Sequence, residues 1–295
     1  APRDAVRALA EDGAGRIWIG YADSGLAFLD PGAFEIEPPS PGSAAMVRAL
    51  LRDSGGLVWA GYKDGGLRAF SPGSAAFSRY RALKDGRPLA AARGLAEAPD
   101  GGIVVCTDGA GPLRLDPRDG GIRPEPGFGG LAEARKAYAA LFAKDGSLWI
   151  GTDGSGLLVR EPGGRIRSFR KGHGLAGLSS DVIWTLHQDR HGRIWVGTEG
   201  GGLARWDPAS GGFVRYPADE GPGSIRGSSV RAVLVDSRDR LWVGTWDGGL
   251  SRLEPGASAF KAWAPDPAEP GSIGDASVNC LFEDSSGAIW EIGRA

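Results

Sequence analysis

A tryptophan recurs along this chain in one local setting, and the spacing of its copies constrains the fold more than any other feature. Each copy directly follows Ile, Leu or Val, and neighbouring copies lie 41 to 48 residues apart. The anchors are Trp18, Trp59, Trp149, Trp195, Trp242 and Trp290, with Val105 standing in the one gap. A period of this length indicates seven copies of one structural repeat.

Each copy contains signals for four short strands, here called a, b, c and d. Strand b holds the anchor, and an apolar segment such as 47–51 precedes it as strand a. A leucine near the start of strand c is preceded by glycine in five copies, as a hairpin residue with positive φ requires. These glycines are Gly25, Gly66, Gly156, Gly202 and Gly249, whereas the third copy has Pro112. Strand d is the weakest signal and contains Phe34, Phe77, Ile122, Ile166, Phe213 and Phe260.

Four strands in each of six repeats and two in the seventh predict an all-β fold, a seven-bladed β-propeller in which one anchor ring fills the wedge between neighbouring blades. A strand-only solenoid usually has shorter repeats. We expect a single domain over 1–295, with repeats at approximately 5–44, 45–90, 91–135, 136–180, 181–228, 229–276 and 277–295. The last repeat has room for two strands only, so the seventh blade is predicted to be incomplete. We expect the natural protein to continue beyond Ala295.

Composition excludes several classes of protein. With 50 glycines and 20 prolines the chain cannot be a helical bundle, while 41% hydrophobic residues and ten tryptophans can bury a core. A net charge of −2 predicts no nucleic-acid partner and no membrane contact by this segment. Cys106 and Cys280 are too few for a zinc site and lie in repeats that are not neighbours, so we predict two buried free thiols. We expect no metal and no cofactor.

The best-formed copies, 198–203 and 245–250, read Thr-Glu-Gly-Gly-Gly-Leu and Thr-Trp-Asp-Gly-Gly-Leu. With the preceding Trp-Val-Gly they resemble the two-component regulator propeller repeat. The third copy departs from it, with Val105 for Trp, Thr107 for Gly and Pro112 for Gly, and so does the seventh, with Glu291 and Ile292. The resemblance implies the periplasmic sensor region of a bacterial receptor, with further receptor domains C-terminal to residue 295, a possible dimer in the full receptor, and an oligosaccharide or other small-molecule ligand.

In a propeller, the turns between strands b and c and the links from d to the next a lie on one face, which usually carries the ligand. Near the start of strand a, a series of polar and aromatic residues occupies one position. It comprises Arg7, Arg48, Tyr138, Trp184, Arg231 and Asn279, with Arg93 one place off register. Trp246, in a b–c turn, joins them as a candidate for stacking. Guanidinium and aromatic groups suit sugar rings and carboxylates. The alternative interpretation is that these arginines pair with acids of an adjacent blade.

Three functions remain open. We favour a non-catalytic sensor, and hence no enzyme activity in this domain. The first alternative is a lyase or hydrolase resembling streptogramin lyases, whose chemistry uses paired histidines with a carboxylate, but His173, His187 and His191 do not recur in phase with the repeat. No Gly-x-Ser-x-Gly nucleophile motif, phosphate loop or zinc spacing is present. The second alternative is a platform for protein interactions.

Overall fold

The computed structural model describes residues 4–30, 35–37, 45–71, 77–172, 177–218, 221, 223–269 and 272–293. Phe34 and His173 lie outside these ranges. The chain divides into two compact units. The first contains Ala1–Phe142 and Asp284–Ala288, and the second contains Ala143–Glu283 and Ile289–Ala295. In the described ranges all regular structure is β-strand except one 3-10 turn, Ala132–Ala134.

The strands follow the predicted order along the chain. The a strands are β1 (Val6–Glu11), β5 (Val47–Arg52), β9 (Ala92–Glu97), β13 (Ala137–Phe142), β17 (Ile183–Gln188), β21 (Val230–Val235) and β25 (Val278–Glu283). The b strands are β2 (Ile17–Tyr21), β6 (Val58–Tyr62), β10 (Ile103–Thr107), β14 (Leu148–Thr152), β18 (Ile194–Thr198), β22 (Leu241–Thr245) and β26 (Ile289–Gly293). Each b strand contains one anchor position.

The outer strands complete six of the sheets. The c strands are β3 (Leu26–Asp30), β7 (Leu67–Phe70), β11 (Gly111–Asp116), β15 (Leu157–Arg160), β19 (Leu203–Asp207) and β23 (Leu250–Leu253). The d strands are β4 (Glu35–Glu37), β8 (Phe77–Tyr80), β12 (Gly121–Pro124), β16 (Ile166–Phe169), β20 (Gly212–Tyr216) and β24 (Lys261–Trp263). The last of these begins just after the predicted Phe260.

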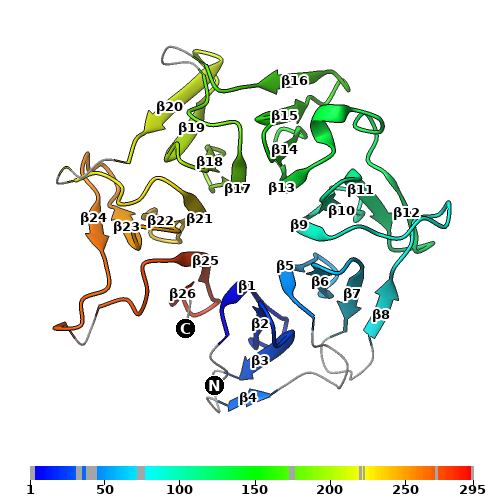
Figure 1. Cartoon of the computed structure of the whole chain (residues 1–295), viewed down its shortest axis with the longest axis horizontal. Coiled ribbons are helices and arrows are strands. Elements are labelled where there is room, and N and C mark those ends of the chain that lie inside the picture. Colours follow the sequence, from blue (N-terminus) through cyan, green and yellow to red (C-terminus); the bar gives the residue numbers. More distant parts are fainter. Residues whose placement is uncertain are drawn as a thin grey trace. The chain divides into compact units, whose positions relative to one another are not determined.

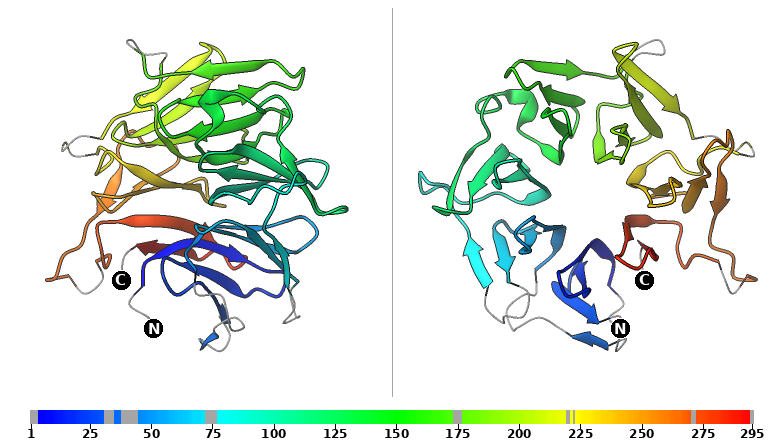
Figure 2. Two further views of the ribbon diagram at one scale, coloured as in Figure 1. Left: turned by 45° about the vertical axis from the view of Figure 1, so that its right-hand side comes forward. Right: turned by 180° about the vertical axis from the view of Figure 1, so that it is seen from behind.

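Six sheets contain four strands in the order a-b-c-d, and a seventh contains β25 and β26 alone. This confirms the prediction of an all-β propeller whose seventh blade is incomplete. Within the first unit, β1, β5 and β9 are successive neighbours, and within the second unit β17, β21 and β25 are. Figure 1 labels these strands, and Figure 2 shows the blades of the first unit, from blue to cyan, from behind. Strand a of one blade therefore faces strand a of the next.

The anchor tryptophans form the core between blades, as predicted. Trp18, Trp59, Trp149, Trp195 and Trp242 are at most 8% exposed, whereas Trp290 of the two-stranded blade is partly exposed. The Trp18 ring lies 5.2 Å from the Phe70 ring of the next blade. Trp195 likewise packs on Val230 and Val243 of the blade that follows it. Each ring thus joins two sheets.

A buried carboxylate holds most of these rings in place. Nε1 of Trp18, Trp59, Trp195 and Trp242 donates to the aspartate six residues earlier at 2.7–3.1 Å, that is to Asp12, Asp53, Asp189 and Asp236. Trp149 donates instead to Ser147 Oγ at 2.7 Å. Burial raises the pKa of Asp189, but hydrogen bonds from Trp195 and Arg193 outweigh it, so that the pKa lies below its usual value. This pairing of tryptophan and aspartate was not predicted from the sequence.

The glycine two residues after the anchor leaves no room for a side chain, because strand a of its own blade or of the next blade approaches closely. A Cβ at Gly197 would lie 2.5 Å from Thr185 Cγ2 and 2.8 Å from Val230 Cγ1. Gly20 and Gly244 meet Val47 and Val278 in the same way. These valines are the first residues of the next a strand and are fully buried. The third blade has Cys106 at this position, and the strand facing it begins with a small residue, Ala137.

Strand pairing in the third blade corrects the sequence register by one residue. Val104 pairs with Arg114 as Trp18 pairs with Phe28, so Val104, not Val105, occupies the anchor position. Cys106 rather than Thr107 then replaces the glycine, and Pro112 replaces the leucine rather than the hairpin glycine. That glycine is Gly111, whose φ is 77°. The prediction was wrong here because two adjacent valines are equally apolar and leave the register ambiguous.

A hydrogen-bonded contact repeats between the a–b turn of one blade and the end of strand a in the next. The backbone N–H of Ser54 donates to Glu97 at 2.7 Å, and that of Ser237 donates to Glu283 at 2.8 Å. Within the first unit, the N–H of Ser285 donates to Glu11 in the same way at 2.8 Å. The same polar contact therefore occurs three times.

Both cysteines are free thiols. Cys106 is fully buried, and burial raises the pKa of its thiol. Cys280 is only partly buried, so the prediction of two buried thiols holds for Cys106 and was wrong for Cys280. The equivalent strand a residues Ala49 and Thr185 are also only partly buried, so exposure at this position of strand a is not special to Cys280.

Candidate functional site: the bulge residues of strand a

Strand a carries one extra residue near its start, and the predicted site residues occupy this position. The a–b register shifts at this point in six blades, for example between Val6 and Ala8 and between Val230 and Ala232. The bulged residues are Arg7, Arg48, Arg93, Trp184, Arg231 and Asn279, and Tyr138 is the second residue of its strand as they are. A β-bulge redirects the side chain and is common beside functional sites. Arg93 is in register with the others, so its predicted offset was wrong.

A repeated backbone hydrogen bond brings the b–c turn next to the bulge. The N–H of the first residue after strand b donates to the carbonyl of the residue just before strand a or one residue earlier. Examples are Asp108 to Ala91 at 3.2 Å, Glu199 to Val182 at 3.0 Å and Trp246 to Ser229 at 2.9 Å. The side chains of Asp108, Glu199 and Trp246 therefore lie beside the bulge residues of their blades.

In the second unit these positions form a cluster of four side chains, Trp184, Arg231, Trp246 and Glu199. The Arg231 guanidinium carbon lies 3.5 Å from the Trp184 ring centroid and 5.0 Å from that of Trp246. Arg231 Nη2 lies 3.4 Å from Glu199 Oε2, and Trp184 Nε1 donates to the same carboxylate oxygen. The Arg231 side chain is 21% exposed and that of Glu199 is 42% exposed. The cluster is a partly exposed, hydrogen-bonded aromatic surface.

In the first unit the bulge residues are mainly cationic. Arg93 Nη2 forms an ion pair with Asp108 at 2.6 Å, and its guanidinium carbon lies 4.6 Å from the Tyr138 ring centroid. Arg48 lies between Arg7 and Arg93, since β5 lies between β1 and β9. Burial, followed by the charges of Arg93 and Arg7, lowers the pKa of Arg48. This end of the first unit therefore concentrates positive charge.

Arg48 differs from its neighbours in that it has no hydrogen-bond or ion-pair partner among the described residues. Its Nε is buried and, like that of Arg93, makes no hydrogen bond to the described residues. A buried donor without a partner destabilises the folded state. A carboxylate or a hydroxyl group of a ligand at this position would supply the missing acceptor.

The structure brings the predicted residues into two clusters. One contains Arg7, Arg48, Arg93 and Tyr138, and the other contains Trp184, Arg231 and Trp246. The alternative interpretation also holds in part, because Arg231 pairs with Glu199 of the preceding blade and Arg93 pairs with Asp108 of its own. Asp108 and Glu199 were not among the residues predicted for the site. Their recurrence directly after strand b was the available signal for their place beside the bulge.

The histidines of the described chain have structural partners. His187 Nε2 accepts the N–H of Val235 on the next blade at 3.1 Å, and burial lowers the pKa of this histidine. His191 is exposed in an a–b turn and lies 2.9 Å from Asp239 of the next a–b turn. Within the described ranges no three His, Cys, Asp or Glu side chains converge in a way that could hold a metal ion. The same ranges contain no helix with the length and apolarity needed to span a membrane.

Comparison with known proteins agrees with the repeat and the fold. Residues 177–200 and 224–247 match the family described as two component regulator propeller. The chain superposes on extracellular domains of two putative two-component systems of B. thetaiotaomicron with TM-scores of 0.82 and 0.80, at 20% and 18% identity. The alignments cover 99% and 100% of this chain but only 39% and 38% of those domains, so the chain spans about two fifths of their length.

The same fold occurs in an enzyme. Virginiamycin B lyase from Staphylococcus aureus superposes with a TM-score of 0.74 at 18% identity, over 99% of this chain and 92% of the lyase. No curated protein sequence matches the chain significantly. At these identities the structural likenesses show the fold alone.

Proposed function

We propose that this chain, which carries two-component regulator propeller repeats at 177–200 and 224–247, is the ligand-sensing propeller of an extracytoplasmic bacterial receptor and binds its ligand without converting it. The ligand class that we propose is an oligosaccharide or another small polar molecule. Its binding surface consists of the bulge residues and the b–c turn residues beside them. The likeness to extracellular domains of putative two-component systems supports this function.

One observation carries the proposal: a repeated bulge presents different side chains in different blades. The backbone at this position is nearly the same in each blade, but it displays Arg in four blades, Trp in one and Tyr in another. A repeat maintained only for packing gives no reason for such variety, whereas recognition requires an asymmetric surface. Aromatic faces stack on sugar rings, and guanidinium groups donate to hydroxyl and carboxylate oxygens.

The remaining assignments follow from the same proposal. The domain would lie in the periplasm, and the rest of the receptor would follow residue 295. A dimer of the full receptor is a natural way to transmit binding across the membrane. Secretion of the full-length protein to the periplasm, assayed by cell fractionation with a cytoplasmic marker as control, tests the location.

The function is tested by screening the isolated chain against glycans and small metabolites, first by thermal shift and then by calorimetry. We expect at least one polar ligand to raise the melting temperature and to be recovered chemically unchanged after prolonged incubation. Mass spectrometry of the recovered ligand distinguishes binding from turnover. Conversion of the ligand at a rate proportional to the protein concentration would contradict a purely sensory role.

A lyase is the second candidate, because virginiamycin B lyase has the same fold, with a TM-score of 0.74. In the described chain, however, His187 and His191 bind a backbone N–H and a turn carboxylate rather than each other. Incubation with a streptogramin B antibiotic, followed by mass spectrometry, tests this candidate. We expect the intact antibiotic to be recovered.

A further inference from the structure

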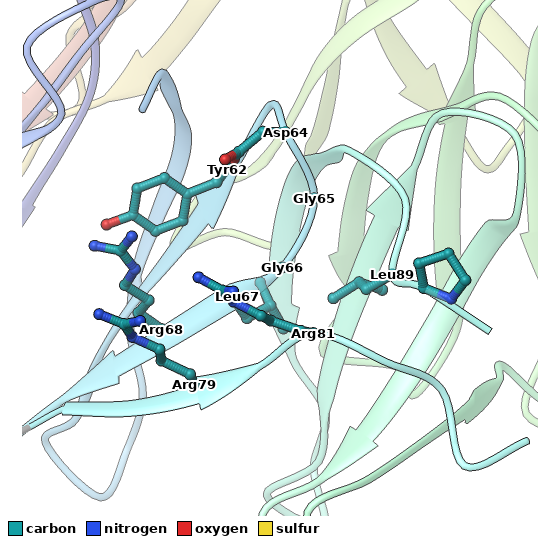
Figure 3. Close-up of a pocket in the computed structure, with 10 residues that line it drawn as sticks. Tyr62, Asp64, Gly65, Gly66, Leu67, Arg68, Arg79, Arg81 and Leu89 are labelled. Atoms are coloured by element: carbon teal, nitrogen blue, oxygen red, sulfur yellow. The ribbon is translucent and has the colours of Figure 1, made fainter. Parts of the chain in front are cut away.

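The second blade contains a pocket that the bulge clusters do not use. It has a volume of about 330 Å³ and lies where the b–c turn 63–66 meets the d-to-a link that contains Pro88 and Leu89. Figure 3 shows its lining. The polar residues are Tyr62, Asp64, Arg68, Arg79 and Arg81, and they come from β6, the b–c turn, β7, β8 and the link. This volume falls near the lower end of the range for small-molecule pockets, about 300–1,000 Å³.

The charge of the pocket is strongly unbalanced. Three guanidinium groups line it, and Asp64 is the one carboxylate among the lining residues. Among the described residues neither Arg79 nor Arg81 forms an ion pair, and both side chains are exposed. Figure 3 shows the guanidinium groups of Arg68, Arg79 and Arg81 on the same side of Tyr62. Three cations that share one concave surface attract an anion.

Tyr62 adds a buried hydroxyl that lacks an acceptor. The residue is 2% exposed, and its Oη lies beside the Arg68 guanidinium, with no acceptor within hydrogen-bond distance among the described residues. The Arg68 guanidinium carbon lies 4.4 Å from the Tyr62 ring centroid and covers the ring. Burial raises the pKa of Tyr62, so its hydroxyl stays protonated and can donate. Tyr62 stands at the end of strand b, where later blades have a threonine whose hydroxyl is satisfied by the hairpin carbonyl, for example Thr198 by Gly202.

We propose that this pocket binds an oxyanion, either a carboxylate or a sulfate or phosphate ester, carried by a small polar molecule. The guanidinium groups donate paired hydrogen bonds to the anion, as their planar geometry allows. A shift of Arg68 toward the anion uncovers the Tyr62 hydroxyl, which then donates to an anion oxygen. The buried Leu67 and Leu89 contact the apolar part of the ligand. This site is distinct from the bulge clusters and does not depend on the proposed function.

The test compares three sugars that differ at one position. Glucose, glucuronate and glucose 6-phosphate share the ring but carry a hydroxyl, a carboxylate and a phosphate ester, and inorganic phosphate is a fourth probe. Calorimetry with the whole chain should give measurable binding for at least one anionic probe and none for glucose. The preferred anion identifies the ester or the carboxylate as the natural group. Equal binding of glucose, or no binding by any anionic probe, would overturn the proposal.

Variants then assign the binding to this pocket. Tyr62→Phe removes only a hydroxyl for which the described residues supply no acceptor, so the melting temperature should change little, while affinity for the anion drops about tenfold. Arg81→Gln should cause a similar or larger loss. Arg87→Gln, which removes an exposed arginine paired with Asp85 in the same unit, is the matched control and should bind normally. If Arg48→Gln abolishes binding while Tyr62→Phe and Arg81→Gln leave it intact, the anion occupies the bulge cluster and the pocket proposal is wrong.

Discussion

At the scale of single residues, the paired anchor tryptophan and aspartate connect the turn, the blade and the next blade. The ring fills the space between two sheets, and its Nε1 donates one of several hydrogen bonds to a buried carboxylate, which in Asp189 also pairs with Arg193. Asp12, Asp189 and Asp236 are each 2% exposed. A carboxylate at such depth is stable only when it is hydrogen-bonded or paired. Removing either partner therefore leaves a cavity or an unsatisfied polar group.

Replacing Trp195 by Ala should lower the free energy of unfolding by about 3–5 kcal/mol, the usual loss when a large buried ring is removed. Trp195→Phe should cost less, because most of the packing remains and only the hydrogen bond to Asp189 is lost. Urea unfolding monitored by far-UV circular dichroism measures both. Val214→Ala is the control, since Val214 is 38% exposed in the same unit. If Trp195→Ala and Val214→Ala behaved alike, the ring would not be part of the core.

His187 should make stability depend on pH. Its pKa is lowered by burial, and its neutral Nε2 accepts the N–H of Val235, so the folded state binds fewer protons than the unfolded state. Stability is therefore full above the unfolded pKa of about 6.5 and is lost as pH falls toward the lower folded pKa. The melting temperature of the wild type should fall as the pH is lowered from 8 to 5. His187→Gln should weaken this dependence, and an unchanged slope would refute the assignment.

The two thiols should differ in reactivity. Cys106 is fully buried with a raised pKa, whereas Cys280 is partly exposed, and it is the thiolate that reacts. Iodoacetamide should label Cys280 first and should reach Cys106 only when the protein is unfolded. Peptide mapping over time measures both rates. Faster labelling of Cys106 in the native protein would contradict the packing of the third blade.

At the scale of elements, blades pack closely because strand b has a glycine where the next strand a begins. Gly197→Ala places a methyl group within 3 Å of Thr185 and Val230 and should cost about 1–3 kcal/mol, as overpacking does. Gly163→Ala is the matched control, because no atom lies within 4 Å of its Cβ position and its φ is not positive. Thermal or urea unfolding compares the two. Equal stability of the two variants would mean that the interface between blades relaxes freely.

The bulge in strand a is the element that produces the candidate site. It could be found from the sequence because it lies at a constant distance from the anchor, and Arg48, Trp184 and Arg231 were identified in this way. The partners of these residues could not be predicted from the sequence. Arg231 contacts Glu199 and Trp184 of another blade, and such contacts depend on how neighbouring sheets face each other. Arg79 recurs as Arg215 of the fifth blade, but Arg68 has no arginine counterpart in the other c strands, so the sequence did not indicate that these side chains line one pocket.

At the scale of the whole molecule, the sevenfold repeat made the fold class predictable. The anchor tryptophans, the glycines of strand b and the b–c turn residues recur together, so the local preference for strands and turns agrees with the overall fold. The errors occurred where a copy lacks its markers: the third blade has Val104 and Val105 in place of a tryptophan and one neighbour, so its register was offset. A single domain over 1–295 remains a prediction, since the chain forms two compact units.

The central claim is that the bulge clusters bind the ligand. Its most direct test is the affinity of a ligand from the screen for wild type and for Trp184→Ala, Arg231→Ala and Arg48→Gln, each shown by circular dichroism and melting to be folded. Aromatic and arginine contacts dominate binding sites, so the variants in at least one cluster should bind the ligand about tenfold or more weakly than the wild type. Gly163→Ala should bind as the wild type does. Unchanged affinity in all three site variants would contradict the account.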